Sequence, residues 1–212
     1  MSLTLYLLRH GETECSRNHA FCGAIDSELT PEGVEMAHAF AAAYSSTSWE
    51  AIFSSPMRRT METAKPLCTA IGIQPILRDG LREINYGKWE GKTPEVISQE
   101  YHDDYLRWSA DPAWYAPNGG ELAVTIASRA MQVIEEIKQL YKNGNVLVVT
   151  HKATIRIILC SLLGIDVGRF RYRWGCPVGS VSIIEFTEHG PMLLTLADRT
   201  HLDARLRNLG GT

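Results

Sequence analysis

Apolar residues occur along this chain in two kinds of run, and each kind predicts a different element. Short continuous apolar runs, bounded by polar or turn residues, are typical of strands that are covered on both faces. The run at 146–149 is the strongest, because it consists only of valine and leucine. The predicted strands are residues 5–8, 51–53, 73–77, 145–150, 181–186 and 192–196, the last two as an antiparallel pair.

Longer segments repeat apolar residues at helical spacing and begin at capping residues. Thr30 and Pro31 are typical of a helix start, because threonine caps the first free amides and proline fits the first helical position. Gly72 and Gly164 are typical of helix ends. The predicted helices are residues 30–44, 56–71, 121–142 and 153–163, and a further helix begins after Thr93.

The alternation of strands and helices predicts an α/β protein. We expect a three-layer sandwich, in which a mostly parallel sheet with an antiparallel edge has helices on both faces. Residues 1–212 are predicted to form a single domain, with 93–120 as a candidate lid over the active site. Two long polar loops, 11–29 and 79–92, interrupt the pattern, and loops of this length are usually functional.

Polar residues follow four of the predicted strands. Arg9 and His10 follow the first, Arg58 and Arg59 the second, Glu83 lies beyond the third, and His151 follows the fourth. Parallel strands bring such residues to one edge of the sheet, where ligands bind. A neutral imidazole can attack phosphorus, guanidinium groups hold phosphate oxygens, and a carboxylic acid can protonate the departing oxygen. The set therefore predicts phosphoryl transfer, and composition alone does not decide between the two neighbouring arginines.

Composition and charge narrow the function classes. The 212 residues are 45% hydrophobic, as in ordinary globular proteins, and the formal net charge of −3 argues against a nucleic-acid binder. The chain has no apolar span of about 18 residues, so we expect no membrane segment or signal peptide. Five cysteines without a C-x-x-C pair predict reduced thiols, no disulfide and a cytoplasmic location. Neither a G-x-x-x-x-G-K-S/T loop nor clustered aspartates occur, so we expect no metal and no cofactor.

Five motifs follow one another along the chain. Residues 8–13 read L-R-H-G-E-T, residues 23–33 read G-x-x-D-x-x-L-T-x-x-G, and residues 54–64 read S-S-P-M-R-R-T-M-E-T-A. Residues 81–91 (L-x-E-x-x-x-G-x-W-E-G) and 148–151 (V-x-T-H) complete the set. In this order the motifs resemble those of the histidine phosphatase superfamily, in its phosphoglycerate-mutase-like branch. Glu28 stands where the family has proline, and the resemblance covers essentially the whole chain.

The resemblance implies a role for each residue of the set. The implied roles are nucleophile for His10, phosphate clamp for Arg9 and Arg59, proton donor for Glu83 and transition-state assistance for His151. Alignment of the third motif places the family's arginine on Arg59 and leaves its neighbour at a variable position. The further candidate substrate contacts are Gly11, Ser16, Cys22, Gly23 and Lys152.

Two of these contacts depart from the family pattern. Ser16 stands where many members have asparagine, and its hydroxyl can still donate one hydrogen bond. Lys152 follows the second histidine where many members have glycine. It either extends to solvent or meets a second anionic group on the substrate, such as a carboxylate. The basic tail after Asp198 either folds over the cleft or ends in solvent.

The resemblance implies a metal-independent phosphomonoesterase that acts on a small phosphorylated metabolite through a phosphohistidine on His10. Phosphoserine and ribazole phosphate are candidate substrates. One alternative is a phosphoglycerate mutase, which typically has a longer chain after the acid motif. The other is a non-catalytic binding protein, which we expect to have lost a site residue. The sequence predicts no nucleic-acid or membrane partner and leaves the oligomeric state open, with a homodimer as one candidate.

Overall fold

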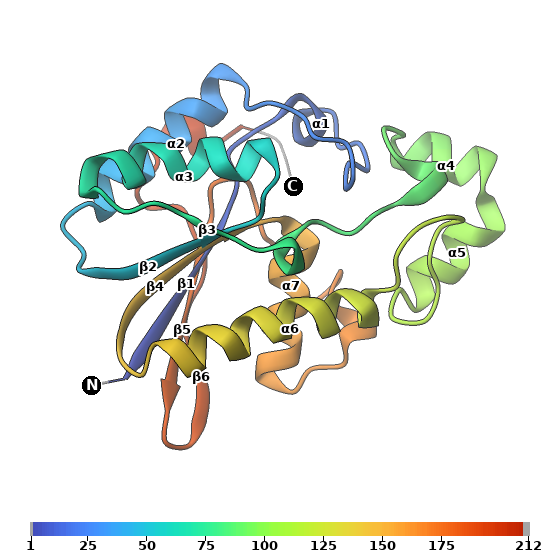
Figure 1. The fold of residues 1–212 in the computed structure, drawn as a ribbon. Helices are drawn as coiled ribbons and strands as arrows, with labels where there is room; N and C mark the ends of the chain where they lie inside the picture. Colours follow the sequence, from blue (N-terminus) through green and yellow to red (C-terminus); the bar gives the residue numbers. More distant parts are fainter. Residues whose placement is uncertain (1, 210–212) are drawn as a thin grey trace.

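A computed structural model of the chain describes residues 2–209 and contains a six-stranded sheet in the order β3-β2-β4-β1-β5-β6 (Figure 1). The first four strands of the chain pair in parallel, whereas β5 and β6 form an antiparallel edge. All six predicted strands are present, although the third is only two residues long. The strands are β1 (Leu3–Arg9), β2 (Trp49–Ser54), β3 (Ile76–Leu77), β4 (Gly144–Thr150), β5 (Val181–Thr187) and β6 (Gly190–Asp198).

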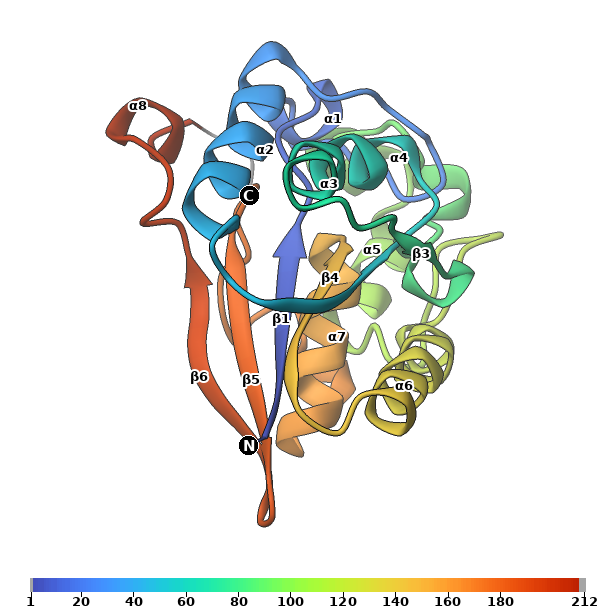
Figure 2. The ribbon, with the colours of Figure 1, turned by 60° about the vertical axis from the view of Figure 1, so that its left-hand side comes forward.

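Helices cover both faces of the sheet, so the architecture is the predicted three-layer sandwich (Figure 1 and Figure 2). Two long helices, α2 and α3, pack on one face, and α6 and α7 pack on the other. The helices are α1 (Glu14–Arg17), α2 (Pro31–Tyr44), α3 (Arg58–Ile71), α4 (Pro94–Glu100), α5 (His102–Ala110), α6 (Ala123–Leu140), α7 (Lys152–Leu163) and α8 (Ala204–Arg207). The short 3-10 turns are η1 (Asp79–Leu81), η2 (Gly87–Trp89) and η3 (Val167–Arg169).

Alternate residues of the central strands face opposite helix layers, as the two-residue period of a strand requires. On β1, Leu5 and Leu7 belong to the core beneath α6 and α7, whereas Leu8 belongs to the core beneath α2 and α3. On β4, Val148 belongs to the core beneath α6 and α7, and Val149 belongs to the core beneath α2 and α3. Both faces of these strands are therefore buried, which explains why the sequence shows continuous apolar runs instead of alternation.

The helix after β2 begins later than the sequence predicts. Pro56 is the predicted start, but α3 begins at Arg58, and Met57 before it has an extended backbone with φ −74° and ψ 143°. The Met57 amide donates to the hydroxyl of Ser55 at 3.4 Å, which turns the chain before the helix starts. The late start places Arg59 in the first turn of α3, at the carboxyl edge of the sheet.

The segment 93–120 forms α4, α5 and an irregular stretch that lie to one side of the sheet (Figure 1). Aromatic contacts join it to the rest of the molecule. The ring centroid of Trp108 lies 5.4 Å from that of Phe21 in the 11–29 loop and 5.2 Å from that of Trp89. The predicted role of the segment as a lid stays a prediction.

The basic tail packs against α2. Leu202 and Leu206 are buried together with Met36, and Arg205 forms an ion pair with Glu35. Of the part of the tail that the structure describes, no residue lines the cavity at the carboxyl edge of the sheet. Up to residue 209 the predicted position over the cleft is therefore wrong. Most polar side chains of the tail lie in solvent, as the other prediction has it, while its leucines complete a small core beside α2.

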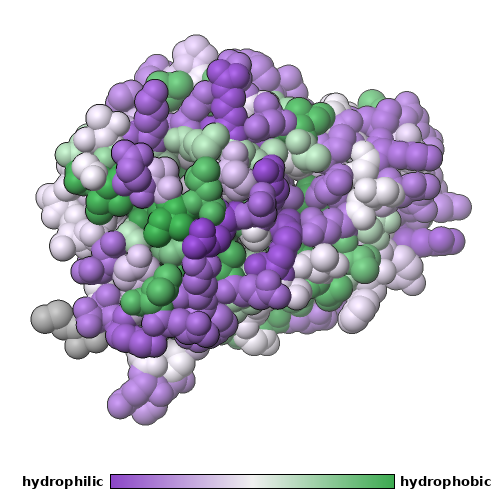
Figure 3. Space-filling model, in the orientation of Figure 1, coloured by the Kyte–Doolittle hydropathy of each residue, from purple (hydrophilic) through white to green (hydrophobic). Residues whose placement is uncertain are grey.

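Hydrophilic residues predominate on the face shown in Figure 3, and the apolar residues on that face lie in separate groups. Exposed apolar side chains of this kind are ordinary on globular proteins. From residue 2 to residue 209, no helix combines the length and the apolar character that crossing a bilayer would require.

Candidate active site

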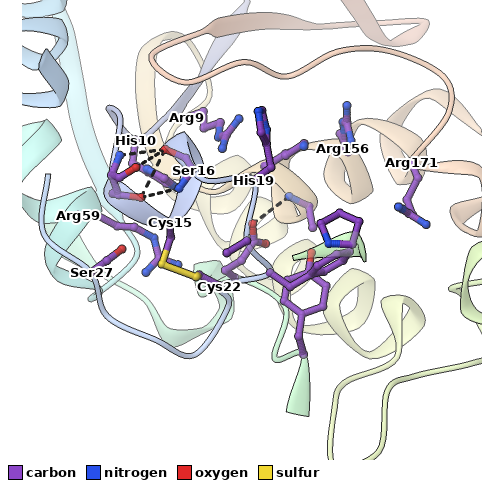
Figure 4. A pocket seen from close by; sticks show the side chains of 18 of the residues that line it. Arg9, His10, Cys15, Ser16, His19, Cys22, Ser27, Arg59, Arg156 and Arg171 are labelled. Carbon is purple, nitrogen blue, oxygen red and sulfur yellow. Dashed lines mark hydrogen bonds between the residues drawn. A yellow bond between two sulfur atoms is a disulfide. The ribbon is translucent and has the colours of Figure 1, made fainter. Parts of the chain in front are cut away.

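Four of the five predicted catalytic residues line one cavity at the carboxyl edge of the parallel strands (Figure 4). Arg9 and His10 stand at the end of β1, Arg59 in the first turn of α3, and Glu83 after η1. The cavity has a volume of about 370 Å³ and is also lined by the 11–29 loop, α5 and α7. His151, at the end of β4, is fully buried behind the cavity wall.

His10 is a buried imidazole with one nitrogen free to react. Its Nδ1 lies 2.8 Å from the Gly11 carbonyl oxygen, and a carbonyl only accepts, so Nδ1 carries the proton. The other nitrogen, Nε2, therefore keeps its lone pair. Burial, together with the positive charges of Arg59 and Arg9, lowers the pKa of His10 well below its ordinary value. The ring is consequently neutral and nucleophilic at neutral pH.

Two buried arginines share the cavity with His10. Arg9 donates to the carbonyl of Cys176 at 2.6 Å, and Arg59 donates to the carbonyls of Gly23 and Ile25 at 3.1 and 2.8 Å. Burial lowers the pKa of both guanidinium groups, to about 10 for Arg9, so both are charged at neutral pH. The hydrogen bonds to carbonyl groups orient the guanidinium planes of Arg9 and Arg59 and leave their positive charge in place.

The structure separates the two neighbouring arginines that composition could not separate. Arg59 is 2% exposed and lines the cavity, with a carboxylate oxygen of Asp26 at 3.9 Å. Arg58 is 52% exposed and pairs with Glu28 and Glu62. Of the two, only Arg59 is therefore in a position to contact an anion inside the cavity.

His151 holds Arg59 in place. Its Nδ1 accepts a hydrogen bond from Nε of Arg59 at 3.1 Å, and its Nε2 lies 2.9 Å from Oγ of Ser55. Because a guanidinium only donates, Nδ1 is unprotonated and Nε2 donates to the serine hydroxyl. Burial and the charge of Arg59 lower the pKa of His151 well below its ordinary value. The ring centroids of His151 and His10 are 5.3 Å apart, so the two histidines are neighbours, although only His10 lines the cavity.

Glu83 is held at the amino end of α7. Its Oε2 accepts from the Ala153 amide at 3.1 Å, and its Oε1 accepts from the amides of Ile84 and Thr154 at 3.0 and 3.2 Å. Among the described residues that line the cavity, Glu83 is the only one with a carboxyl group. Glu90 in the same loop accepts from backbone amides instead. Glu83 is therefore the carboxyl group placed to exchange a proton with a ligand.

The prediction of reduced thiols without a disulfide is wrong for two cysteines, because Cys15 and Cys22 form a disulfide. The helical turn α1, which contains Cys15, and the residues after it bring the Cα atoms of the two cysteines to 6.1 Å, which spacing alone did not reveal. Cys68, Cys160 and Cys176 are buried free thiols. Cys22 thus lines the cavity as half of a disulfide, not as a free thiol.

Three other predicted contacts have structural tasks. Ser16 lines the cavity, but its Oγ donates to the Thr13 carbonyl and accepts from the Thr13 amide, both at 2.9 Å. Gly11 and Gly23 stand outside the described cavity lining. A β-carbon on them would lie 2.4 and 1.6 Å from backbone carbonyl oxygens, so the close approach of chain segments requires glycine at both positions. Substrate contact by these three residues stays a prediction.

Lys152 lines the cavity, and so do two arginines that the sequence analysis missed, Arg156 and Arg171 (Figure 4). Burial lowers the pKa of Lys152 to about 7. A signal for Arg156 was present, because it is charged in an otherwise apolar helix, four residues after Lys152 and so on the same helix face. Arg171 lies in an irregular stretch after η3, where no periodicity locates it.

Comparison with known proteins finds relatives over nearly the whole chain. A model of the histidine phosphatase superfamily (branch 1) matches residues 5–199. Phosphoserine phosphatase 1 of Hydrogenobacter thermophilus is 32% identical over 198 residues, 93% of either chain. Glucosyl-3-phosphoglycerate phosphatase of Mycolicibacterium vanbaalenii is 31% identical over 193 residues, 87% of this chain and 84% of that protein. The solved structure of YhfR from Bacillus stearothermophilus has a TM-score of 0.87 at 30% identity and covers 95% of this chain and 100% of its own.

Proposed function

We propose a mechanism for the cavity from one premise: this chain belongs to branch 1 of the histidine phosphatase superfamily. It is a phosphoric monoester hydrolase that acts on a small phosphorylated metabolite. The observation that carries the mechanism is the neutral His10, with an unprotonated Nε2, in a cavity that also holds two buried guanidinium groups. In the proposed reaction, His10 accepts the phosphoryl group and then passes it to water.

In the first step, the lone pair on Nε2 of His10 forms a bond to phosphorus, and the bond between phosphorus and the ester oxygen breaks. The departing oxygen takes a proton from the carboxyl group of Glu83, so the product leaves as an alcohol. Nδ1 of His10 keeps its proton and its hydrogen bond to the Gly11 carbonyl, which stabilises the positive charge that the ring acquires.

Fixed positive charge stabilises the transition state. Arg9 and Arg59 face the oxygens of the transferring group, and preoriented charges of this kind are the largest catalytic contribution in phosphoryl transfer. In the proposed mechanism His151 assists the transition state through Arg59, because its Nδ1 accepts from Nε of that arginine and so orients the guanidinium. These cations support the prediction that the reaction needs no metal.

In the second step, water attacks phosphorus and gives a proton to the Glu83 carboxylate, and the bond between phosphorus and Nε2 breaks. Inorganic phosphate leaves, and both His10 and Glu83 return to their starting states. A phosphoglycerate mutase would instead pass the group to a bound hydroxyl. Two of the relatives compared above, from Hydrogenobacter thermophilus and Mycolicibacterium vanbaalenii, are phosphatases, which supports water as the acceptor and a catalytic role for the cavity.

Phosphoserine is the substrate that we propose first. Support comes from the phosphoserine phosphatase of Hydrogenobacter thermophilus, which matches this chain almost from end to end. Ribazole phosphate stays a second candidate from the sequence analysis. The cytoplasmic location also stays a prediction, because the Cys15–Cys22 disulfide removes the argument from reduced thiols. A homodimer likewise stays a prediction.

Hydrolysis of p-nitrophenyl phosphate in the presence of EDTA tests the mechanism. We expect the wild type to be active and to carry a phosphoryl group that is stable in base and labile in acid, as a phosphohistidine is. We expect His10→Ala to lose turnover and labelling together. His38→Ala, on α2 and outside the cavity lining, is the control and should keep both. Substantial phosphatase activity in His10→Ala would contradict the assignment of His10 as the nucleophile.

A further inference from the structure

We propose that Lys152, Arg156 and Arg171 form a second anion-binding subsite in the cavity, which selects phosphomonoesters that carry a second anionic group. The three residues are called the cation wall below. The inference rests on the proposed function for one point, the position of the phosphoryl group beside His10. It adds the recognition of the part of the substrate that does not react.

The lining of the cavity carries much more positive than negative charge. Five of the described lining residues are arginine or lysine, and Glu83 is the single acidic one. Arg9 and Arg59 act on the charge of His10 and are balanced by the two charges of a bound phosphate. Glu83 already accepts hydrogen bonds at the amino end of α7. Within the described residues, the cation wall therefore forms no ion pair, and Glu83 is the one lining carboxylate whose charge acts on Lys152 and Arg156.

Lys152 and Arg156 form no ion pair within the described chain, and the carboxylate of Glu83 raises the pKa of both only from a distance. They stand four residues apart on α7, a spacing at which like charges repel each other. No ion pair and no side-chain hydrogen bond joins either of them to residues 2–209. Nε of Arg156 is buried without a hydrogen-bond partner there. Leaving half-buried cationic groups unpaired costs stability, and an anionic ligand would reduce this cost.

Arg171 is oriented by uncharged groups. Its guanidinium carbon lies 3.9 Å from the ring centroid of Trp108. Its Nη1 donates to Oγ of Ser109 at 3.3 Å and to the hydroxyl of Tyr172 at 3.2 Å. These contacts fix the direction of the guanidinium and leave its charge unbalanced. A cation that is held in this way loses little entropy when it binds an anion.

The arrangement of the arginines gives the ligand a direction. In Figure 4, Arg9, Arg156 and Arg171 follow one another along one side of the pocket, and the disulfide lies on the other side. Burial and the charges of Arg9 and Arg156 together lower the pKa of Lys152 to about 7, which supports the crowding of cations along this side. A ligand with its phosphate at Arg9 can therefore place a second anionic group against the cation wall.

The chemistry of the cation wall identifies the class of ligand. Guanidinium groups bind carboxylates and phosphates through the same paired N–H donors, so both anions fit. The volume of about 370 Å³ suits a small metabolite. The proposed class is therefore a small phosphomonoester with a second anionic group, and the experiment decides between a carboxylate and a second phosphate.

Three substrates that differ only at the far end test the subsite. Glycerol 3-phosphate, 3-phosphoglycerate and glycerol 1,3-bisphosphate share a phosphorylated three-carbon chain that ends in a hydroxyl, a carboxylate or a phosphate. We expect kcat/KM for the carboxylate or the bisphosphate to exceed that for glycerol 3-phosphate by about tenfold or more. The substrate with the larger value identifies the second anion. In Arg156→Gln we expect this ratio to fall by about tenfold, and in Arg156→Lys by less.

Arg173→Gln is the matched control, because Arg173 is exposed, carries the same charge and is outside the cavity lining. We expect it to leave the ratio unchanged. A thermal unfolding curve of each variant shows whether it is folded. The subsite is refuted if the wild type treats the three substrates alike, or if folded Arg156→Gln keeps the wild-type ratio.

Binding measurements separate this inference from the proposed function. Calorimetric titration of His10→Ala with the same three compounds measures recognition without turnover. If the compounds with two anionic groups bind more tightly but the wild type hydrolyses none of them, the proposed function fails and the subsite stands. If the wild type hydrolyses all three and His10→Ala binds them equally, the proposed function stands and the subsite is overturned.

Discussion

A single carboxyl group, that of Glu83, controls the departure of the alcohol in the proposed reaction. Glu83→Gln keeps the size of the side chain and removes the proton. We expect kcat/KM for phosphoserine to fall by about 100- to 10,000-fold. The loss for p-nitrophenyl phosphate should be much smaller, because nitrophenolate leaves without a proton. Steady-state kinetics with both substrates measures the difference, and equal losses would contradict the assigned role. Glu90→Gln, in the same loop, is the control and should affect both substrates alike.

Lys152 makes stability depend on pH. Burial lowers the pKa of its amine from 10.5 to about 7 in the folded protein. Between these values the unfolded chain binds more protons, so the free energy of unfolding rises with pH across this window. Lys152→Met removes the penalty, so we expect its gain in Tm to be largest at about pH 7 and below and to vanish toward pH 10.5. Thermal unfolding across this range measures the gain, and the exposed Lys65→Met is the control. A gain in Tm that does not change with pH would show that the lowered pKa of Lys152 does not cause the pH dependence of stability.

At the residue scale, sequence predicts the positions that follow from strand ends. Arg9 and His10 were predictable because β1 ends there and its carboxyl end opens into the site. The choice of Arg59 over Arg58 required the family alignment, because the two arginines differ in burial, which the sequence does not show. Arg171 could not be predicted, because its position depends on stacking against Trp108, a contact between distant irregular segments.

At the scale of elements, the Cys15–Cys22 disulfide holds the turn that carries Ser16 and Phe21 beside the cavity. Closing so short a loop contributes about 2 kcal/mol to stability, so we expect dithiothreitol to lower Tm by about 5 °C. We also expect KM to rise, because the turn gains freedom next to the substrate. Thermal unfolding and kinetics with and without reductant measure both effects.

The double variant Cys15→Ser/Cys22→Ser controls for effects of the reductant elsewhere. It should resemble the reduced wild type and show no response to dithiothreitol. An unchanged Tm of the wild type, with complete reduction verified by mass spectrometry, would show that the disulfide does not hold the turn.

Helices and strands could be predicted where burial imposes a pattern of apolar residues on the sequence. Their first and last residues were harder to predict. Both faces of β1 and β4 are covered, which leaves continuous apolar runs in the sequence. The strand predicted at 73–77 shrinks to Ile76–Leu77 because Pro75 has no amide for a ladder at the sheet edge. The disulfide escaped prediction because it depends on the short turn α1, which has too few residues to show a period.

At the scale of the whole molecule, the three-layer sandwich follows from the alternation of elements, but the placement of α4 and α5 does not. These helices pack on the remainder through an aromatic cluster in which Trp108 contacts Phe21 and Trp89. Arg171, from the irregular stretch after η3, stacks on the same tryptophan. The segment 93–120 is thus joined to the site by a few side chains, which an irregular sequence does not reveal.

This connection predicts that ligand binding orders the segment 93–120. An anion bound to Arg171 adds a further contact to a guanidinium that already stacks on Trp108, and so couples the bound ligand to the helices α4 and α5. We expect 3-phosphoglycerate to slow amide hydrogen exchange in α4 and α5 of His10→Ala by severalfold, and to leave α2, which lies outside the cavity, unchanged. Trp108→Leu should weaken the protection without removing binding. If exchange in α4 and α5 is the same with and without saturating ligand, the segment is a fixed wall of the cavity and not a lid.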